Sequence, residues 1–149
     1  MAEISPSAVP GDEFFYRYLQ QQKMEDAAAV AALQTSFMAF VAALQTSFMT
    51  FLIEAADNKD YRVLVNSPHA FTINSITTKS GAGTCTLTAK INSTALGGAA
   101  NSVSTSEVTQ THSSANDVAI GDDVVLTVSS NSGAEDVSIT IACTLTLDA

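Results

Sequence analysis

The chain has 149 residues, 46% of them hydrophobic, which is enough for one ordinary domain with a core or for a smaller domain with an appended element. Fifteen acidic residues against six basic ones give a formal net charge of −9, which disfavours nucleic acid and anionic membrane surfaces as partners. Two cysteines and two histidines are too few for a disulfide-dense scaffold or a His-rich metal site.

The composition changes near residue 60 and divides the chain into three parts. Pro6, Pro10 and Gly11 predict an extended anchoring arm over residues 1–12. Residues 13–57 are rich in Ala, Gln, Leu, Met and Phe and predict a helical stalk. Residues 61–149 contain 14 Thr and 13 Ser interspersed with Val, Ile and Leu, which indicates strands and turns. We therefore expect an α+β chain in which a long N-terminal helix precedes an antiparallel β-sandwich.

A tandem repeat lies within the predicted helix. Residues 30–40 read VAALQTSFMAF and residues 41–51 read VAALQTSFMTF, so the two copies differ only at Ala39 and Thr50. Eleven residues make almost three helical turns, and both copies therefore present the same face of a helix. The apolar positions fall in a stripe about 120° wide. This stripe is the predicted oligomerisation surface: Val30, Leu33, Phe37, Phe40, Val41, Leu44, Phe48, Phe51 and Leu52.

Polar positions interrupt this spacing upstream. Phe15 and Leu19 keep the spacing of the stripe, but Gln22 and Asp26 place polar groups in it. Such groups either set the register and number of helices in a bundle or mark a loosening of the packing.

Three arrangements would cover the stripe. Association of several copies is the simplest, and three Phe-bearing helices fill a central column better than two, which favours a homotrimer with coiled-coil-like packing. A membrane span is the first alternative, because residues 27–53 carry no charge and about 20 residues cross a bilayer. Packing against the chain's own β domain is the second alternative. Polar residues within both repeats and acidic flanks disfavour the membrane span.

The second half of the chain shows the alternation of an antiparallel sandwich. In one expected strand Cys85, Leu87, Ala89 and Ile91 share a face, and in the last strand every second residue from Val137 to Leu147 does so. Both cysteines are therefore expected to point inward. The expected strands are residues 61–65, 70–78, 84–92, 103–111, 123–129 and 136–147, with a turn at Asn131-Ser132-Gly133.

Residues 61–148 also carry motifs found elsewhere. The run from Ser93 to Leu147 contains N-S-V-S, G-D-D-V-V and E-D-V-S-I segments. It resembles a β module at the C-terminal ends of fibre-like and head-decoration structural proteins of tailed bacteriophages. The resemblance covers none of the helix and implies a structural role in a virion.

Candidate sites for chemistry are weak. Cys85 and Cys143 suit free buried thiols better than a disulfide in a reducing cytoplasm. Acidic residues in the turns match no EF-hand spacing, and His69 and His112 have no further ligands at metal-binding spacing. The acidic residues are Asp117, Asp122, Asp123, Glu135 and Asp136. No nucleophile or phosphate-binding motif is present, so we expect no catalytic residues, cofactor or metal and no enzyme activity.

The sequence thus predicts a structural, non-enzymatic virion component such as a fibre, collar or capsid decoration. The arm and helix would anchor it to a capsid, portal or tail protein, and the β head would project. Its expected partners are further copies of itself and other virion proteins, with a host surface receptor as a further candidate and no nucleic acid. The alternative is a membrane-anchored surface or adhesin module with residues 27–53 in the bilayer.

Overall fold

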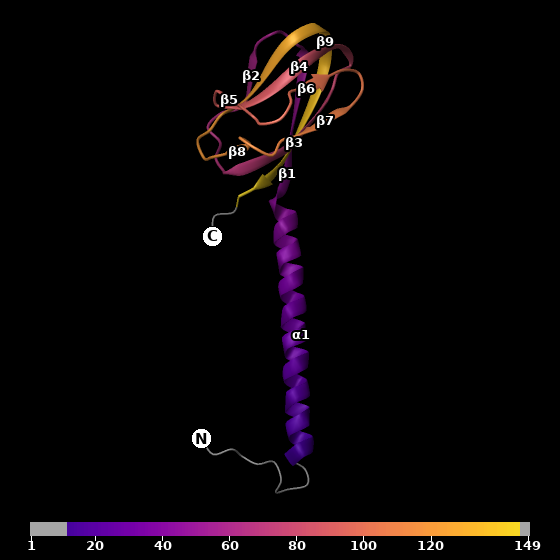
Figure 1. The fold of residues 1–149 in the computed structure, drawn as a ribbon, viewed down its shortest axis with the longest axis vertical. Coiled ribbons are helices and arrows are strands. Elements are labelled where there is room, and N and C mark those ends of the chain that lie inside the picture. Colours follow the sequence, from indigo (N-terminus) through magenta and orange to yellow (C-terminus); the bar gives the residue numbers. More distant parts are fainter. Residues whose placement is uncertain (1–11, 147–149) are drawn as a thin grey trace. The chain divides into compact units, whose positions relative to one another are not determined.

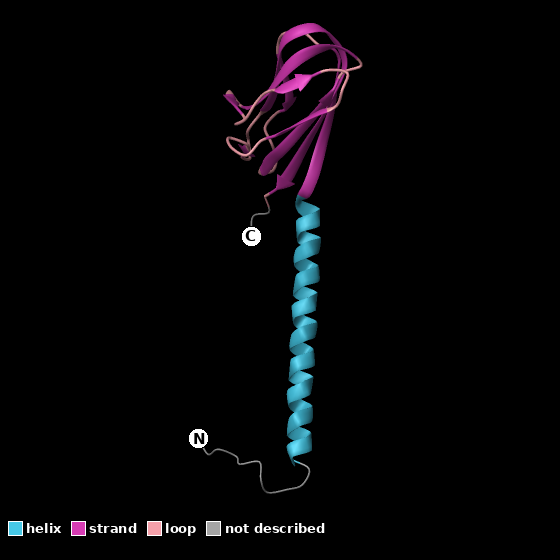
Figure 2. Ribbon diagram, turned by 45° about the vertical axis from the view of Figure 1, so that its right-hand side comes forward, coloured by secondary structure: helices cyan, strands magenta, loops and turns pink. Residues whose placement is uncertain are grey.

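The computed structural model describes residues 12–146 and contains two compact units, one ending at Ala43 and one starting at Leu44. The first unit is helical and the second, called here the β domain, is built of antiparallel strands (Figures 1 and 2). The predicted α+β class is confirmed. The predicted arm lies outside the described residues except for Asp12, at which the helix begins.

Helix α1 spans Asp12–Gln45, 34 residues. Ala, Leu, Gln and Met dominate its sequence, and these residues have high helix propensity. Local side-chain contacts add to it: Arg17 pairs with Glu13 across one turn at 2.7 Å, and the Gln21 amide donates to Glu25 at 2.9 Å. The polar Thr35 inside the helix donates its hydroxyl hydrogen to the Ala31 carbonyl at 2.9 Å.

The helix ends twelve residues earlier than predicted. The expected continuation to residue 57 is wrong, because strand β1, Thr46–Ala55, follows Gln45 directly. Neither Gly nor Pro stands at this junction, and no basic residue lies in the last turn, so no local signal ends the helix. Pairing with strand β9, Val124–Leu145, ends it instead: nine positions from Thr46 to Ala55 face β9 in antiparallel register.

The two repeat copies therefore adopt different structures. Residues 35–40, TSFMAF, are helical, whereas residues 46–51, TSFMTF, are extended. The residues that follow each copy differ in what the β domain can bury. Ile53 is 8% exposed and Ala56 is 5% exposed, and both belong to the core. The corresponding residues after the first copy are Ala42 and Gln45, which offer less apolar volume.

Within residues 12–146 the β domain contains nine strands. Strand β1 is followed by five shorter strands and by three long ones, β3, β4 and β9, that line the core: β2 Asp60–Leu64, β3 Phe71–Lys79, β4 Ala82–Ile91, β5 Thr94–Ala95, β6 Asn101–Val103, β7 Val108–Thr111, β8 Asp117–Val118 and β9 Val124–Leu145. The expected strand over residues 103–111 is two strands, β6 and β7, separated by residues 104–107. The β domain also begins before the expected residue 61, because β1 belongs to it.

Strand β9 is the centre of the sheet and pairs along both edges. Its second half pairs with β1 on one edge and with β3 on the other. Its first half pairs with β2 and β4 in the same way. Since β1 and β4 both meet Glu135, the segments β1–β2 and β3–β4 follow opposite edges of β9 from end to end.

A bend in β9 folds this ribbon over itself. Ser130, Gly133 and Asp136 have positive φ values of 50°, 63° and 49°. The residues of the core cluster change from even numbers, Val124, Leu126 and Val128, to odd numbers, Val137 to Cys143, across these positions. The expected turn at residues 131–133 is therefore a bend within one strand, and the two expected strands 123–129 and 136–147 are joined.

The core lies inside the folded ribbon. Ile73, Leu87, Leu126 and Ile141 are fully buried, and they come from both halves of the ribbon. The predicted inward positions on β4 are confirmed, as are Val137, Ile139, Ile141 and Cys143 on β9. Leu145 is half-buried, and Leu147 lies outside the described residues.

The register of β1 can be tested by mutation. Replacing Ile53 with Ala should reduce the free energy of unfolding of the β domain by about 2–5 kcal/mol, because it leaves a cavity under β1. Replacing the exposed Thr50 with Ala makes the two repeats identical and should change stability by about 1 kcal/mol or less. Urea denaturation of the full chain measures both. Equal effects of the two substitutions would show that β1 does not pack as described.

Candidate interaction surfaces

The structure divides the nine predicted oligomerisation residues between two elements. Six lie in α1: Val30, Leu33, Phe37, Phe40, Val41 and Leu44. Phe48, Phe51 and Leu52 lie in β1, so a single helical stripe through all nine is wrong. Phe51 is half-buried and packs on the β-domain core, whereas Phe48 and Leu52 are 71% and 60% exposed.

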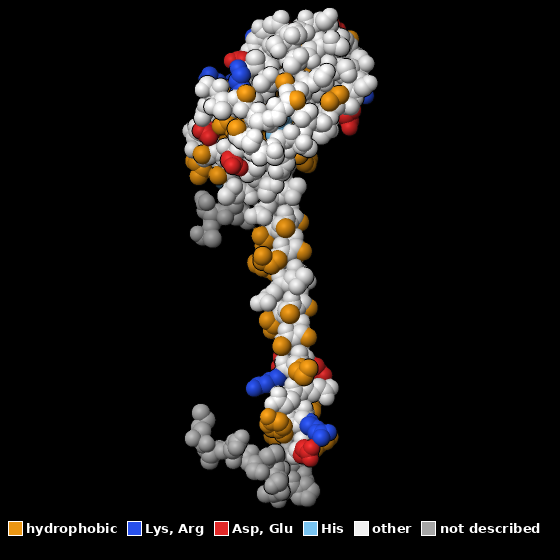
Figure 3. Space-filling model, in the orientation of Figure 1, with side chains coloured by type: hydrophobic (Ala, Val, Ile, Leu, Met, Phe, Trp, Pro, Cys, Tyr) orange, Lys and Arg blue, Asp and Glu red, His pale blue; other side chains and the backbone are white. Residues whose placement is uncertain are grey.

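Helix α1 presents a long apolar surface. Leu33, Phe37, Phe40 and Leu44 are each between 59% and 71% exposed, and Val41 is half-buried. At about 100° per residue, the six stripe residues of α1 fall within about 100° of one another around the helix axis. Figure 3 shows these apolar side chains along the helix, with the charged side chains gathered toward its N-terminal part. Exposed apolar patches of this kind are typical of protein or membrane contact surfaces.

The helix also satisfies the length and hydropathy criteria for a membrane span, with a mean hydropathy of 1.8 in the most apolar window between Glu13 and Gln45. The predicted span over residues 27–53 is wrong in its last part, since residues 46–53 form a strand of the β domain. The uncharged helical part is residues 27–45. Its 19 residues extend about 28 Å, close to the thickness of a bilayer core.

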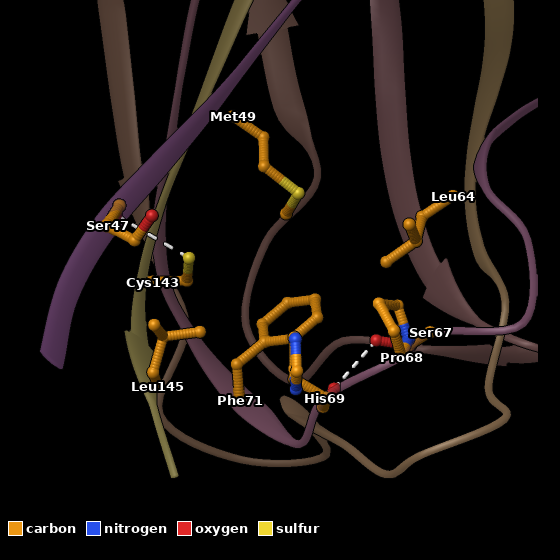
Figure 4. A pocket seen from close by; sticks show the side chains of 9 residues that line it. All are labelled: Ser47, Met49, Leu64, Ser67, Pro68, His69, Phe71, Cys143 and Leu145. Atoms are coloured by element: carbon orange, nitrogen blue, oxygen red, sulfur yellow. Dashed lines mark hydrogen bonds between the residues drawn. The ribbon is translucent and has the colours of Figure 1, made fainter. Parts of the chain in front are cut away.

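The β domain has an apolar hollow between β1, β2, β3 and β9. Figure 4 shows Met49, Leu64, Phe71 and Leu145 around it, one residue from each of these strands. Its cavity volume of about 170 Å³ has room for one group the size of benzene. Ser47, Ser67 and His69 also border it, and Ser67 Oγ donates to the His69 carbonyl at 2.7 Å. The hollow therefore offers mainly apolar contact.

The two cysteines are free and buried, as their inward positions predict. Burial raises the pKa of the Cys85 thiol. Burial also raises the pKa of the Cys143 thiol, and a smaller contribution from the Ser47 side chain acts in the opposite direction. The Cys143 Sγ also donates to the Ser47 carbonyl at 3.5 Å. A raised pKa keeps a thiol protonated at neutral pH, and the protonated form is a poor nucleophile and metal ligand.

Two acidic residues in the turns accept hydrogen bonds that connect neighbouring loops. Asp122 accepts hydrogen bonds from the Asn92 side chain at 2.8 Å and from the Ala119 N–H at 2.9 Å. These bonds, the Asn92 contact foremost, hold the pKa of Asp122 below its usual value. Asp123 accepts from the Asn66 N–H at 2.9 Å, and its own N–H donates to the Asn92 amide oxygen at 3.0 Å. The carboxylates thus stabilise three connections of the β domain in place of the cation considered from the sequence.

The remaining acids and the histidines do not assemble into a metal site. Asp117 accepts a hydrogen bond from Thr72, whereas Glu135 and Asp136 lie at the bend of β9. His112 is buried, with Nδ1 at 2.9 Å from the Gly97 carbonyl, and His69 is exposed. Within residues 12–146, no group of three His, Cys, Asp or Glu side chains is arranged to hold a metal ion.

Two features were missed from the sequence. The hollow was missed because its lining joins residues from Ser47 to Leu145, and no local pattern reports such proximity. The outward position of Phe48 and Leu52 was missed because they were assigned to a helix. The sequence of residues 46–53 carries no signal for it, because Phe48, Met49 and the run from Phe51 to Ile53 are apolar on both faces of the strand.

No protein-family model matches the chain, and no curated protein matches it. Among solved structures it is similar to the N-terminal cellulose-binding domain from Cellulomonas fimi β-1,4-glucanase C. That match has a TM-score of 0.34 and 12% identity and covers 68% of this chain and 78% of the other. A similarity this low supports no transfer of ligand or function.

The thiols provide a test of the buried core that depends on pH. Because their folded-state pKa values are raised, the unfolded chain loses these protons first as pH increases. The unfolding free energy should therefore be unaffected by the thiols below their unfolded pKa, about 8.5, and should fall as pH rises above it. Urea denaturation between pH 7 and pH 9.5 measures this.

The matched control is the Cys85→Ala, Cys143→Ala double variant, in which the same alkaline range should show a smaller decline. In the native protein at pH 8, both thiols should also react with iodoacetamide far more slowly than in urea. Rapid alkylation of the native chain would contradict their burial.

Proposed function

We propose that this chain is a structural, non-enzymatic component of a virion, such as a fibre, collar or capsid decoration. In this role α1 associates with α1 of other copies as a homotrimeric stalk and carries the β domain. The observation that supports the proposal best is the apolar stripe from Val30 to Leu44, which is exposed over the C-terminal half of a 34-residue helix.

Self-association stabilises such a helix. A helix of this length in water gains little from propensity alone and depends on burying an apolar face. Burying one Leu or Phe side chain contributes about 1.5–3 kcal/mol, so Leu33, Phe37, Phe40 and Leu44 together would contribute substantially in each copy. The eleven-residue repeat keeps these positions on one face, which suits helices that are straight or slightly right-handed in their supercoil.

The virion assignment has separate support. Residues 61–148 resemble β modules of tailed-bacteriophage structural proteins, and the described residues present engaged acids and protonated thiols in place of a catalytic set. In the proposal the arm, residues 1–12, and α1 anchor the chain to a capsid, portal or tail protein. A host surface receptor is a further proposed partner of the β domain.

A membrane-anchored surface module is the second candidate function. The uncharged run over residues 27–45 of α1 favours it, since its length matches a bilayer core. Gln34, Ser36 and Gln45 disfavour it, because polar side chains in the hydrocarbon region need partners.

Two insertion variants distinguish the helical stalk from the membrane span, because they shift the two parts of the stripe around the helix axis by different angles. A third copy of the repeat, inserted after Ser36, adds about three turns and keeps Val30 and Leu33 on the same face as Phe37 and Leu44. Inserting two alanines at the same place rotates these two groups apart by about 200°. Sedimentation of the full chain should show a trimer for the wild type, whose subunit mass is 15.5 kDa, and for the third-copy variant, whose subunit is correspondingly heavier. The two-alanine variant should associate at least about tenfold more weakly.

Membrane insertion depends on length and hydropathy and not on this phase, so both variants should still float with liposomes if the second candidate is correct. A monomeric wild-type chain at micromolar concentration would contradict the stalk. Equal association of the two insertion variants would show that the stripe is not the contact.

The virion assignment is tested on particles. Mass spectrometry of purified virions from the phage that encodes this chain should detect peptides from both α1 and the β domain after high-salt washing. Recovery of the chain only in the host membrane fraction would contradict the proposal.

A further inference from the structure

We propose that the outward face of strand β1, carrying Phe48 and Leu52, is buried against the same region of a second copy of this chain. This inference rests on the proposed self-association of α1 and extends the contact between copies into the β domain. The contact involves residues 46–54 of β1, the adjacent strand β9, and strand β3 on the other side of β9.

The outward face of β1 exposes two large apolar side chains. Side chains alternate along β1, so Ser47, Met49, Phe51 and Ile53 turn toward the core and Phe48, Thr50 and Leu52 turn to solvent. Phe48 is 71% exposed and Leu52 is 60% exposed. Each would contribute about 1.5–3 kcal/mol if it were fully buried in a contact.

The neighbouring strands supply a flat platform beside these two side chains. In register, Phe48 faces Ala142, Thr50 faces Thr140 and Leu52 faces Ser138. On the far side of β9 the same rows continue into Ser75, Thr77 and Lys79 of β3. Apart from Lys79, the side chains of β9 and β3 in these rows are small and would allow close approach of another molecule, with Phe48 and Leu52 as the largest apolar groups on the platform.

The charge of this face favours a second copy over a different partner. The whole chain carries a net charge of −9, so most contacts between copies bring like charges together. Residues 46–53 of β1 and residues 138–144 of β9 contain no charged side chain, and the two charges at the end of the platform, Glu54 and Lys79, are opposite in sign. Such a face can meet the same face of a second copy with little electrostatic repulsion.

The edge of β1 leads to the same conclusion. Among the described strands β1 pairs with β9 alone, so its other edge is an edge of the sheet. Natural edge strands are usually short or carry Lys, Pro or a bulge, which prevent pairing with other chains. β1 has ten residues, and Glu54 near its end is its one charged residue. A long uncharged edge strand is tolerated where an assembly covers it.

Chain continuity places the two contacts near each other. Thr46 follows Gln45 without a linker, so Phe48 is four residues from Leu44. Helices in contact lie about 8–10 Å apart, and four residues of extended chain cover about 13 Å. Association through Leu44 therefore brings the β1 strands of the copies within reach of each other.

Site-directed cross-linking in the full chain tests the contact. Thr50→Cys places a thiol between Phe48 and Leu52, and Ser102→Cys is the matched control on the exposed side of β6. With a short bis-maleimide, Thr50→Cys should give covalent dimers and higher species at a yield at least about fivefold above the Ser102→Cys and wild-type chains. The native cysteines are buried and provide the background.

A second variant tests the two apolar side chains. In the Thr50→Cys chain, adding Phe48→Ser and Leu52→Thr should reduce the cross-linked fraction several-fold. Both positions are exposed, so these substitutions should leave the β domain folded, as circular dichroism would show.

Sedimentation of the same samples distinguishes failure of this inference from failure of the stalk. A trimer in which Thr50→Cys cross-links no better than Ser102→Cys would overturn the β1 contact and leave the association of α1 standing. A monomer throughout would overturn both. Cross-linking that is unchanged by Phe48→Ser and Leu52→Thr would show that the two side chains do not form the contact.

Discussion

The structure depends on pairing along both edges of strand β9. The segments β1–β2 and β3–β4 follow its opposite edges, and the three longest strand pairings of the β domain, those of β1, β3 and β4, all involve it. The bend at Ser130, Gly133 and Asp136 turns this flat ribbon into an enclosed core. Gly83 meets the bend closely, because a Cβ there would lie 1.9 Å from the Gly133 carbonyl oxygen. Glycine is therefore required where β4 crosses the bend.

The same pairing determines where the helix ends. Residues 46–55 contain no local signal that would end the helix. Antiparallel pairing with β9 gives their backbone hydrogen-bond partners and buries Ile53. One consequence is that a duplicated peptide serves two purposes. Its first copy contributes an exposed helical stripe, and its second copy completes the sheet and leaves Phe48 and Leu52 exposed. Both exposed sets are suited to contacts between copies of the chain.

The chemistry of the described side chains agrees with a role in assembly. The carboxylates of Asp122 and Asp123 accept hydrogen bonds from residues in other loops. The two thiols remain protonated in the core. Carboxylates that hold connections together stabilise a domain but are not available for proton transfer. The hollow lined by Met49 and Phe71 is bordered mainly by apolar side chains. Exposed apolar surfaces on α1 and β1 are the distinctive features of the described residues.

Alternation and composition in the sequence determined the α+β class and the inward faces of β4 and of the second half of β9. These properties are local: Cys85 to Ile91 and Val137 to Cys143 alternate with Thr and Ser, and only a half-buried strand satisfies that pattern. The platform beside Phe48, the hollow and the bend in β9 depend on which strands become neighbours, and only the tertiary structure decided them. The end of the helix belongs to the same group. TSFMAF and TSFMTF satisfy helical and extended periodicity equally well, so pairing with a strand some 90 residues away, and burial of Ile53 beyond the repeat, selects the extended form for the second copy alone.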